Sequence, residues 1–407
     1  MKKALSLFLA SALLLGTAAA LPEGSSIIPQ LAITAQAVTI VSSGETDEFK
    51  YDIIRYGADG SKEYVRLKKY KKKSATDVVV PSTIEGRPVR ELYESVFKGK
   101  TKLKSVVIPE GVVEINNYCF SGCTALVSIK LPSTLTYCGH AVFNNCKKLK
   151  EIELPDSLDT LGCGEMFSLC SKLEKVKLPA QLLQIDNDSF WKCESLKTID
   201  IPESVRKIGA NAFEQTAFES ITIPKNVTYL GIGAFWGCTN LKTIDIPANV
   251  KTIEYYGFLE CSALTSVTLH NGLEKIGMET FCDCKKLKSI TIPKSVTTIG
   301  KYAYGYYKDG QKYVKVTGAK IYGYKGSAAQ KYAKKYDIKF VAIKDPGDVN
   351  GDTVIDIKDV TLLKQYLANW NVSVDQLSAD VNGDGSVDIK DVTLICQKLA
   401  NWNVELK

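Results

Sequence analysis

The sequence is poor in histidine, the side chain that most often serves as general base or zinc ligand. It has two in 407 residues, His140 and His270. His140 follows Cys138 in TYCGHAVF, and a Cys–His pair is conceivable there, although other repeat units have Asn, Ala or Gly at that turn position. Acidic residues are plentiful, but no pair stands out as the two facing carboxylates that glycoside hydrolysis needs. We predict no catalytic residue.

Long apolar runs are also absent beyond the N-terminus, so the sequence offers no second membrane span. Lys2 and Lys3 precede ALSLFLASALLLGTAAA, a pattern typical of an export signal. Cleavage after Ala20 or after Ala37 is possible, which makes residues 1–37 the expected signal peptide. The sequence therefore predicts a secreted or extracellular protein that is soluble or attached to the cell surface.

Charge is unevenly distributed. The net charge is +7, but residues 346–407 carry ten acidic and five basic side chains, a net of −5, so the remainder carries +12. Such an asymmetry indicates two modules. The basic part is read as a lysine-rich solvated surface, with attraction to acidic polymers as the alternative.

Twelve cysteines in an exported chain would ordinarily suggest disulfides. Their spacing indicates a repeat instead, because seven of them recur every 22 to 24 residues, with one double step. These are Cys123, Cys146, Cys170, Cys193, Cys238, Cys261 and Cys284. Columns of Pro, Phe and Leu keep the same period, and we expect the thiols to be structural fillers.

One unit reads LKTIDIPESVRKIGANAFEQT, residues 196–216. Alternation in its first piece predicts a short strand with Ile199 and Ile201 inward and Asp200 outward. Pro202 ends the strand ladder, and Gly209 is expected to permit a bend. A unit of this size cannot bury its apolar side alone, so stacking is required. The prediction is a β-rich, right-handed solenoid.

The outward strand positions form a candidate ligand face. It comprises Lys130, Glu153, Lys177, Asp200, Thr222, Asp245, Thr268 and Thr291. Few aromatic residues occur there, which favours a protein ligand over a polysaccharide, and a solvated spacer without a ligand remains an alternative. Trp191 and Trp236 follow the Phe column and are expected on the opposite side.

LKTIDIPESVRKIGANAF resembles the leucine-rich repeats of the BspA-like class of bacterial surface proteins. The resemblance covers roughly residues 75–305, and AKIYGYKGSAAQKYAKKYDIKFVAI (319–343) resembles the closing segment of that class. It implies a solenoid of about 23-residue leucine-rich repeats over 75–343, with a short helix in GSAAQKYAKKY as its C-terminal cap. Residues 46–74 are expected to be a β-rich N-terminal cap.

Two acidic twelve-residue loops follow, DVNGDTVIDIKD and DVNGDGSVDIKD. Such a loop offers calcium its oxygen ligands at positions 1, 3, 5, 7, 9 and 12, with a backbone carbonyl at position 7. The expected ligands are Asp348, Asn350, Asp352, Val354, Asp356 and Asp359 in the first loop, and Asp380, Asn382, Asp384, Ser386, Asp388 and Asp391 in the second. Two Ca²⁺ ions are predicted.

The loops differ at position 6, which is Thr353 in the first and Gly385 in the second. A positive φ there would strain threonine by about 1–2 kcal/mol, so we expect the first site to be weaker. The duplication continues past the loops: residues 348–372 and 380–404 match at 19 of 25 positions, including a helix after each loop. With so small a core, metal binding should drive folding.

Paired loop–helix repeats of this kind resemble a type I dockerin, here over residues 348–407 after a linker at 344–347. The resemblance implies a small all-α, calcium-binding domain and a cohesin partner on a scaffoldin of a cellulosome-like complex. It also implies cohesin contacts at Ile357, Lys358, Lys364, Gln365, Ile389, Lys390, Cys396 and Gln397. Near-symmetry permits two binding orientations, and Cys396 opposite Lys364 breaks the symmetry.

The sequence thus predicts a non-catalytic recognition or adhesion protein, docked through calcium and cohesin, whose solenoid binds a protein, cell-surface or plant-wall ligand. An enzyme or enzyme-regulating component of polysaccharide catabolism is the alternative.

Overall fold

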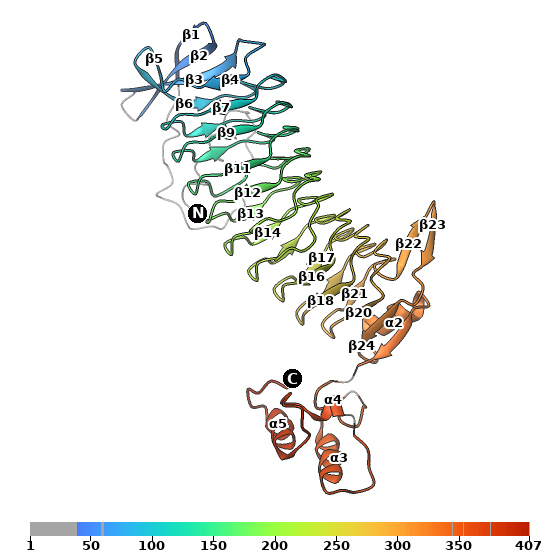
Figure 1. The fold of residues 1–407 in the computed structure, drawn as a ribbon. Helices are drawn as coiled ribbons and strands as arrows, with labels where there is room; N and C mark the ends of the chain where they lie inside the picture. The colour runs from blue at the N-terminus through green and yellow to red at the C-terminus, as the bar shows by residue number, and fades with distance from the viewer. Residues whose placement is uncertain (1–38, 58–60, 344, 353, 375, 407) are drawn as a thin grey trace, which may run out of the picture.

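The computed structural model describes residues 39–57, 61–343, 345–352, 354–374 and 376–406. The expected signal peptide and Thr353 lie outside this part of the chain. An elongated β-solenoid forms most of the structure, and helices α3 to α5 follow at its C-terminal end (Figure 1).

The N-terminal end is rich in strands. β1 (Thr39–Glu45), β2 (Phe49–Tyr56) and β3 (Lys62–Tyr70) pair antiparallel, and β1 begins ahead of residue 46. β3 then pairs in parallel with β6 (Arg87–Leu92), and β6 also pairs antiparallel with β5 (Thr83–Ile84). This segment covers the first apolar layer of the solenoid with Phe49, Tyr51 and Tyr70.

The strands of the units belong to two sets. The first set lies on the side predicted to carry the ligand face: β4 (Asp77–Val79), β7 (Ser105–Val107), β9 (Ser128–Lys130), β11 (Glu151–Glu153), β12 (Lys175–Lys177), β16 (Thr243–Ile246), β18 (Ser266–Leu269) and β20 (Ser289–Thr291). The second set is shorter: β8 (Glu114–Ile115), β10 (Tyr137–Cys138), β13 (Gln184–Ile185), β14 (Lys207–Ile208), β15 (Tyr229–Leu230), β17 (Thr252–Ile253), β19 (Lys275–Ile276) and β21 (Thr298–Ile299).

Neither ladder of parallel strands is continuous. In the first set no strand forms at 198–201 or 221–223. Asp200 and Thr222 therefore lie outside any strand. In the second set the ladder stops after β10 and resumes at β13. The first set is also interrupted between β9 and β11 and between β18 and β20. The breaks at 198–201 and 221–223 and after β10 lie near units of irregular length: residues 157–167 hold one residue more than 204–213, and FEQTAFESITIP (213–224) is one shorter than FWKCESLKTIDIP (190–202). A one-residue change alters register, so neighbouring strands lose their partners.

The interior confirms the predicted columns. Successive Phe rings from Phe97 to Phe281 stack with centroids 5.0 to 5.6 Å apart. The column cysteines are buried and free, and each Sγ donates to the carbonyl of the Phe one unit earlier, as in Cys193 to Phe167 at 3.2 Å. The interpretation as structural thiols is therefore confirmed.

Glycine is required at position 209 for a reason other than the expected bend. Its φ is not in the left-handed region, and a Cβ there would lie 2.5 Å from Asn187 Oδ1 and 2.7 Å from Asn187 N. Close approach of the preceding unit is what requires glycine. The left-handed residues of the unit are instead the positions two before and two after each Phe, such as Asp188 (φ 54°) and Lys192 (φ 57°) around Phe190.

The C-terminal cap contains the predicted helix. β24 (Lys320–Gly323) and β25 (Lys339–Ala342) extend the first strand set beyond β20, and α2 (Ala328–Lys335), capped by Ser327, lies between them in sequence. Ala329, Tyr332 and Ala333 of α2 close the open end of the core. A hairpin of β22 (Tyr306–Asp309) and β23 (Lys312–Lys315) projects from the same end (Figure 1).

The tail has its own small core. α3 (Ile357–Leu367) and α5 (Ile389–Leu399) are the helices that the duplication predicts, but each begins inside its twelve-residue loop, at position 10, and a short α4 (Gln376–Ala379) lies between them. Val360, Leu363, Val392 and Ile395 are buried together, separate from the solenoid core. Leu399, at the C-terminal end of α5, is 36% exposed. So few buried side chains supply little folding free energy.

Candidate functional site

The last carboxylate of each acidic loop is buried. Asp359 and Asp391 are fully inaccessible to solvent and stand at the third position of α3 and α5. Asp391 Oδ1 accepts from the backbone N–H of Val381 at 2.9 Å, and its Oδ2 accepts from that of Asp388 at 2.9 Å. Asp359 bonds Asn350 and Asp356 in the same way. Each carboxylate thus joins the start of its loop to the start of its helix.

Asp348 is buried as well, whereas the other loop carboxylates are nearer the surface. Asp352 accepts from Val354 N at 2.9 Å, and Asp384 accepts from Ser386 N at 2.9 Å. Asp356 and Asp388 cap the helices by accepting from Lys358 N and Lys390 N. These contacts lower the pKa of Asp356 and of Asp384, chiefly through the backbone hydrogen bonds, so both groups stay ionised.

The donor set of each loop fits calcium. Within the described residues, neither Asp359 nor Asp391 has a Lys or Arg partner at ion-pair distance, and a buried carboxylate without a counter-cation is costly. Hard oxygen ligands from Asp and Asn side chains at alternating positions are those that calcium prefers. In the described chain, no three His, Cys, Asp or Glu side chains come together as a metal cluster. The loops would therefore depend on Asn and backbone carbonyl oxygens as well.

The predicted cohesin contacts lie at matching places in the two copies. Ile357 is 66% exposed and Ile389 64%, which is unusual for isoleucine. Lys358 and Lys390 form equivalent ion pairs with the loop carboxylates, for example 3.2 Å to Asp356 and 3.2 Å to Asp388. Lys364 and Cys396 are exposed, while Gln365 and Gln397 are half-buried. An apolar side chain followed by a lysine is thus presented twice.

The predicted ligand face of the solenoid is solvent-exposed at all eight of its positions. Cross-strand pairs place Glu153 beside Lys177 and Asp245 beside Thr268. The structure does not bring the eight into one sheet. Asp200 and Thr222 lie in no strand, and the other six positions are divided among four separate sheets. No aromatic ring from these positions interrupts the polar surface.

The two histidines show no catalytic arrangement. His270 Nε2 lies 2.6 Å from Asp245 Oδ1 on the exposed sheet face. His140 Nε2 lies 3.8 Å from Glu165 Oε1. Cys138 is fully buried, and burial raises the pKa of its thiol to about 12, so it carries no thiolate for nucleophilic attack at neutral pH.

Sequence reasoning missed a pair of neighbouring carboxyls, Glu91 on β6 and Glu114 on β8, which are paired across the two strands. Glu91 is buried and accepts from Arg66 Nε at 2.7 Å, Tyr64 Oη at 3.1 Å and Asn116 Nδ2 at 2.9 Å. Burial and the charge of Glu91 raise the pKa of Glu114 to about 7. The unit period could have aligned the two glutamates, but the arginine comes from the N-terminal strands, outside the repeat.

Two family models match the chain. The BspA type leucine rich repeat region matches in six copies over residues 90–218 and 206–317, and the dockerin type I domain matches residues 346–400. No curated protein matches. In the described chain, no helix is both long and apolar enough to cross a membrane.

Solved structures of similar fold include three bacterial proteins. A leucine-rich repeat protein of T. pallidum is 25% identical, with 60% of this chain and 91% of that chain covered and a TM-score of 0.32. A leucine rich cell surface protein of Faecalibacterium prausnitzii is 21% identical (72% and 97% covered, TM-score 0.37). A leucine-rich repeat protein of Bacteroides ovatus is 23% identical (74% and 100% covered, TM-score 0.37). With its family match spanning more than half of its length, the chain belongs to the BspA-type leucine-rich repeat family and carries a C-terminal type I dockerin domain.

Proposed function

We propose that this protein is a secreted, non-catalytic recognition protein that its dockerin attaches to a cohesin of a cellulosome-type scaffoldin. Residues 1–37 would direct export, and residues 46–74 and 75–343 would form the capped solenoid. Residues 344–347 would link the solenoid to the dockerin, residues 348–407, which would bind the cohesin. The observation that carries the proposal is the duplicated loop–helix unit matching the type I dockerin, joined to a solenoid without a catalytic arrangement in its described residues.

Calcium is the proposed cofactor, with one ion in each loop. Asp348, Asn350, Asp352, Val354, Asp356 and Asp359 would hold the first, and Asp380, Asn382, Asp384, Ser386, Asp388 and Asp391 the second. The ion would supply the positive charge that the buried carboxylates lack. These carboxylates already connect each loop to its helix, so ion binding and helix docking should occur together.

Cohesin binding is assigned to the exposed, duplicated surface of α3 and α5. An exposed isoleucine followed by a lysine offers a small apolar anchor next to a charge, which is the composition of interface centres and rims. The equivalent ion pairs of Lys358 and Lys390 orient both copies alike, so a single partner can bind either.

The solenoid is proposed to bind a protein, cell-surface or plant-wall ligand. Its exposed, polar sheet face supports recognition rather than chemistry, because oppositely charged side chains and threonines lie beside one another along it.

A capture experiment tests the proposal. Residues 38–407 and residues 38–343 serve as baits against secreted and surface fractions of the producing organism, each with calcium and with chelator. We expect a cohesin-bearing protein only with the longer bait and calcium. Any protein held by both baits is a ligand of the solenoid. Absence of a calcium-dependent partner would contradict the docking assignment, and hydrolysis of plant polysaccharides by residues 38–343 would favour the enzymatic alternative.

A further inference from the structure

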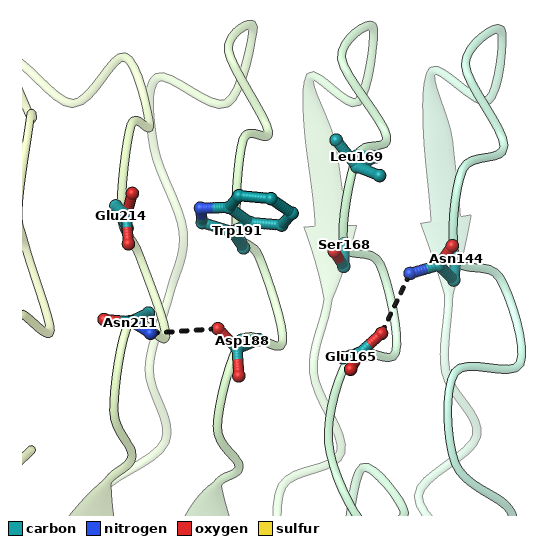
Figure 2. Close-up of a pocket in the computed structure, with 8 residues that line it drawn as sticks. All are labelled: Asn144, Glu165, Ser168, Leu169, Asp188, Trp191, Asn211 and Glu214. Carbon is teal, nitrogen blue, oxygen red and sulfur yellow. Dashed lines mark hydrogen bonds between the residues drawn. The ribbon is translucent and has the colours of Figure 1, made fainter.

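A shallow hollow lies on the turn side of the solenoid, along the segments that carry the Phe column. It has a volume of about 320 Å³ and crosses four successive units. Figure 2 shows the residues that line it, which are Asn144, Glu165, Ser168, Leu169, Asp188, Trp191, Asn211 and Glu214. None of them belongs to the ligand face predicted from the strands.

The hollow lies between the two irregular units. The extra residue of 157–167 precedes Glu165, and the shortened segment 213–224 contains Glu214. A second hollow, which includes Gln215, Thr216 and Ala217, marks the shortened segment itself. Regular units bring equivalent side chains into contact. A change of unit length disturbs that match, which is a physical reason for an open surface here.

Its polar groups form carboxylate–amide pairs between neighbouring units. Asn144 Nδ2 donates to Glu165 Oε2 at 3.2 Å, and Asn211 Nδ2 donates to Asp188 Oδ1 at 3.1 Å (Figure 2). Each pair uses one amide N–H and one carboxylate lone pair, which leaves further donors and acceptors on both partners. A ligand with hydroxyl groups can use both kinds, because a hydroxyl donates and accepts.

An aromatic side chain lies between these pairs. Trp191 is half-buried, its indole nitrogen is directed toward Glu214, and its six-membered ring toward Ser168 (Figure 2). Glu214 is 7% exposed, and burial raises its pKa. The Lys192 ammonium lies 4.7 Å from the Trp191 ring centroid. Indole offers an apolar surface on which the C–H faces of a sugar ring can pack.

The sign of charge narrows the ligand class. Glu165, Asp188 and Glu214 outweigh Lys192 and His140, so a polyanion such as an acidic polysaccharide or nucleic acid would be repelled. A strongly cationic ligand would compete with the side-chain amides of Asn144, Asn211 and Gln215, which already donate to the three carboxylates. A neutral, hydroxyl-rich ligand avoids both the repulsion by the carboxylates and the competition with their amide partners.

We propose that this hollow binds a neutral linear oligosaccharide along the solenoid axis, with Trp191 as the stacking platform and the two carboxylate–amide pairs as hydroxyl partners. Phe rings of the four units follow one another at 5.4 to 5.6 Å, comparable to the length of one pyranose residue in an extended chain. The inference rests on the proposed recognition role of the solenoid and assigns it a site and a ligand class.

The test is calorimetry on the full chain with calcium present. The probes are cello-, xylo- and manno-hexasaccharides, with an oligogalacturonide of equal length as the acidic arm. We expect at least one neutral probe to bind, and Trp191→Ala to weaken it about tenfold or more because stacking and buried area are both lost. Asn144→Ala, at the other end of the hollow, should also weaken it. Trp402→Ala, which removes an exposed indole from the tail, is the matched control and should bind as the parent does.

Three outcomes would overturn the inference: no binding of any neutral probe, unchanged binding in folded Trp191→Ala and Asn144→Ala, or preference for the acidic probe. Thermal unfolding of each variant separates loss of the site from loss of the fold. If neutral probes fail while residues 38–343 capture a protein, the oligosaccharide assignment is wrong and the recognition role stands. If cohesin capture fails while the probes bind, the docking assignment is wrong and this site stands.

Discussion

At the scale of single residues, Glu114 links the fold to pH. Its pKa is about 7 in the folded chain against 4.5 as the ordinary value, because its half-buried carboxyl is poorly solvated and faces Glu91. A raised carboxyl pKa means that the folded state holds its proton while the unfolded state releases it. The stabilisation is therefore fully present below about pH 4.5 and is lost as pH rises through 7.

We expect Glu114→Gln to remove this dependence. Relative to the parent, the variant should gain roughly 1–3 kcal/mol in unfolding free energy between pH 4.5 and 8, a range that allows for partial solvent screening. Denaturant unfolding across that pH range measures it. Glu153→Gln, at an exposed carboxyl on β11, is the control. Parallel pH curves for the parent and Glu114→Gln would contradict the assignment.

The residue scale also shows what the sequence could and could not predict. The buried Phe, Leu and Cys columns were predictable because each recurs many times, so position in the unit determines burial. The pair of Glu91 and Glu114 was not, since its arginine and tyrosine partners come from β3, outside the period. Likewise, Gly209 is required because Asn187 of the previous unit approaches it closely. The sequence of a single unit does not reveal a distance between two units.

At the scale of elements, a loop and its helix form one cooperative piece through a single carboxylate. Asp391 bonds backbone N–H groups of Val381 and Asp388 and is a proposed calcium ligand. We expect Asp391→Asn to weaken calcium binding at the second loop about tenfold or more, because a charged ligand is lost. The N-terminus of α5 should also lose about 0.3–1 kcal/mol of stabilisation, because a negative charge in its first turn is removed.

Calcium titration followed by helical circular dichroism of the full chain measures both effects. Glu405→Gln removes the same charge from an exposed position outside the loops and is the control. The solenoid transition should stay at its parental temperature, because its core cluster is separate from that of the tail. Equal calcium affinity in Asp391→Asn and Glu405→Gln would exclude Asp391 as a ligand.

The two loops should differ at position 6. Gly385 has φ +87° in the second loop, a conformation that a β-branched residue adopts with strain of about 1–2 kcal/mol. Thr353 stands at the equivalent position of the first loop. Thr353→Gly should therefore raise calcium affinity at that loop by roughly fivefold to thirtyfold. Site-resolved titration by NMR measures it, and equal affinities of the two loops in the parent chain would contradict the expectation.

The existence of the two tail helices was predictable because the pattern is local and duplicated. Their starts were not: each helix begins at loop position 10 rather than after the loop, because Asp356 and Asp388 cap the helices there. The interruptions of the strand ladders were not predicted, although the irregular unit lengths are visible in the sequence. Length shows that register must change somewhere in a unit, but which strand loses its partner depends on the packing of neighbouring units.

At the scale of the whole molecule, duplication gives the proposed docking surface two equivalent halves. Ile357 with Lys358 and Ile389 with Lys390 have matching exposure and matching ion pairs. If a cohesin binds either half equally, losing one half removes one of two equal binding modes. Affinity then falls only about twofold, whereas losing both halves abolishes binding.

We therefore expect Ile357→Asp and Ile389→Asp, each alone, to retain calcium-dependent capture by cohesin with losses near twofold, and the double variant to lose capture. Surface plasmon resonance with the full chain measures the three affinities. Ile40→Asp, at an exposed isoleucine on β1, controls for added charge. A large loss from one single variant and none from the other would mean that one orientation dominates. The difference between Lys364 and exposed Cys396 offers a physical reason for such a bias, which exchanging these two residues would then reverse.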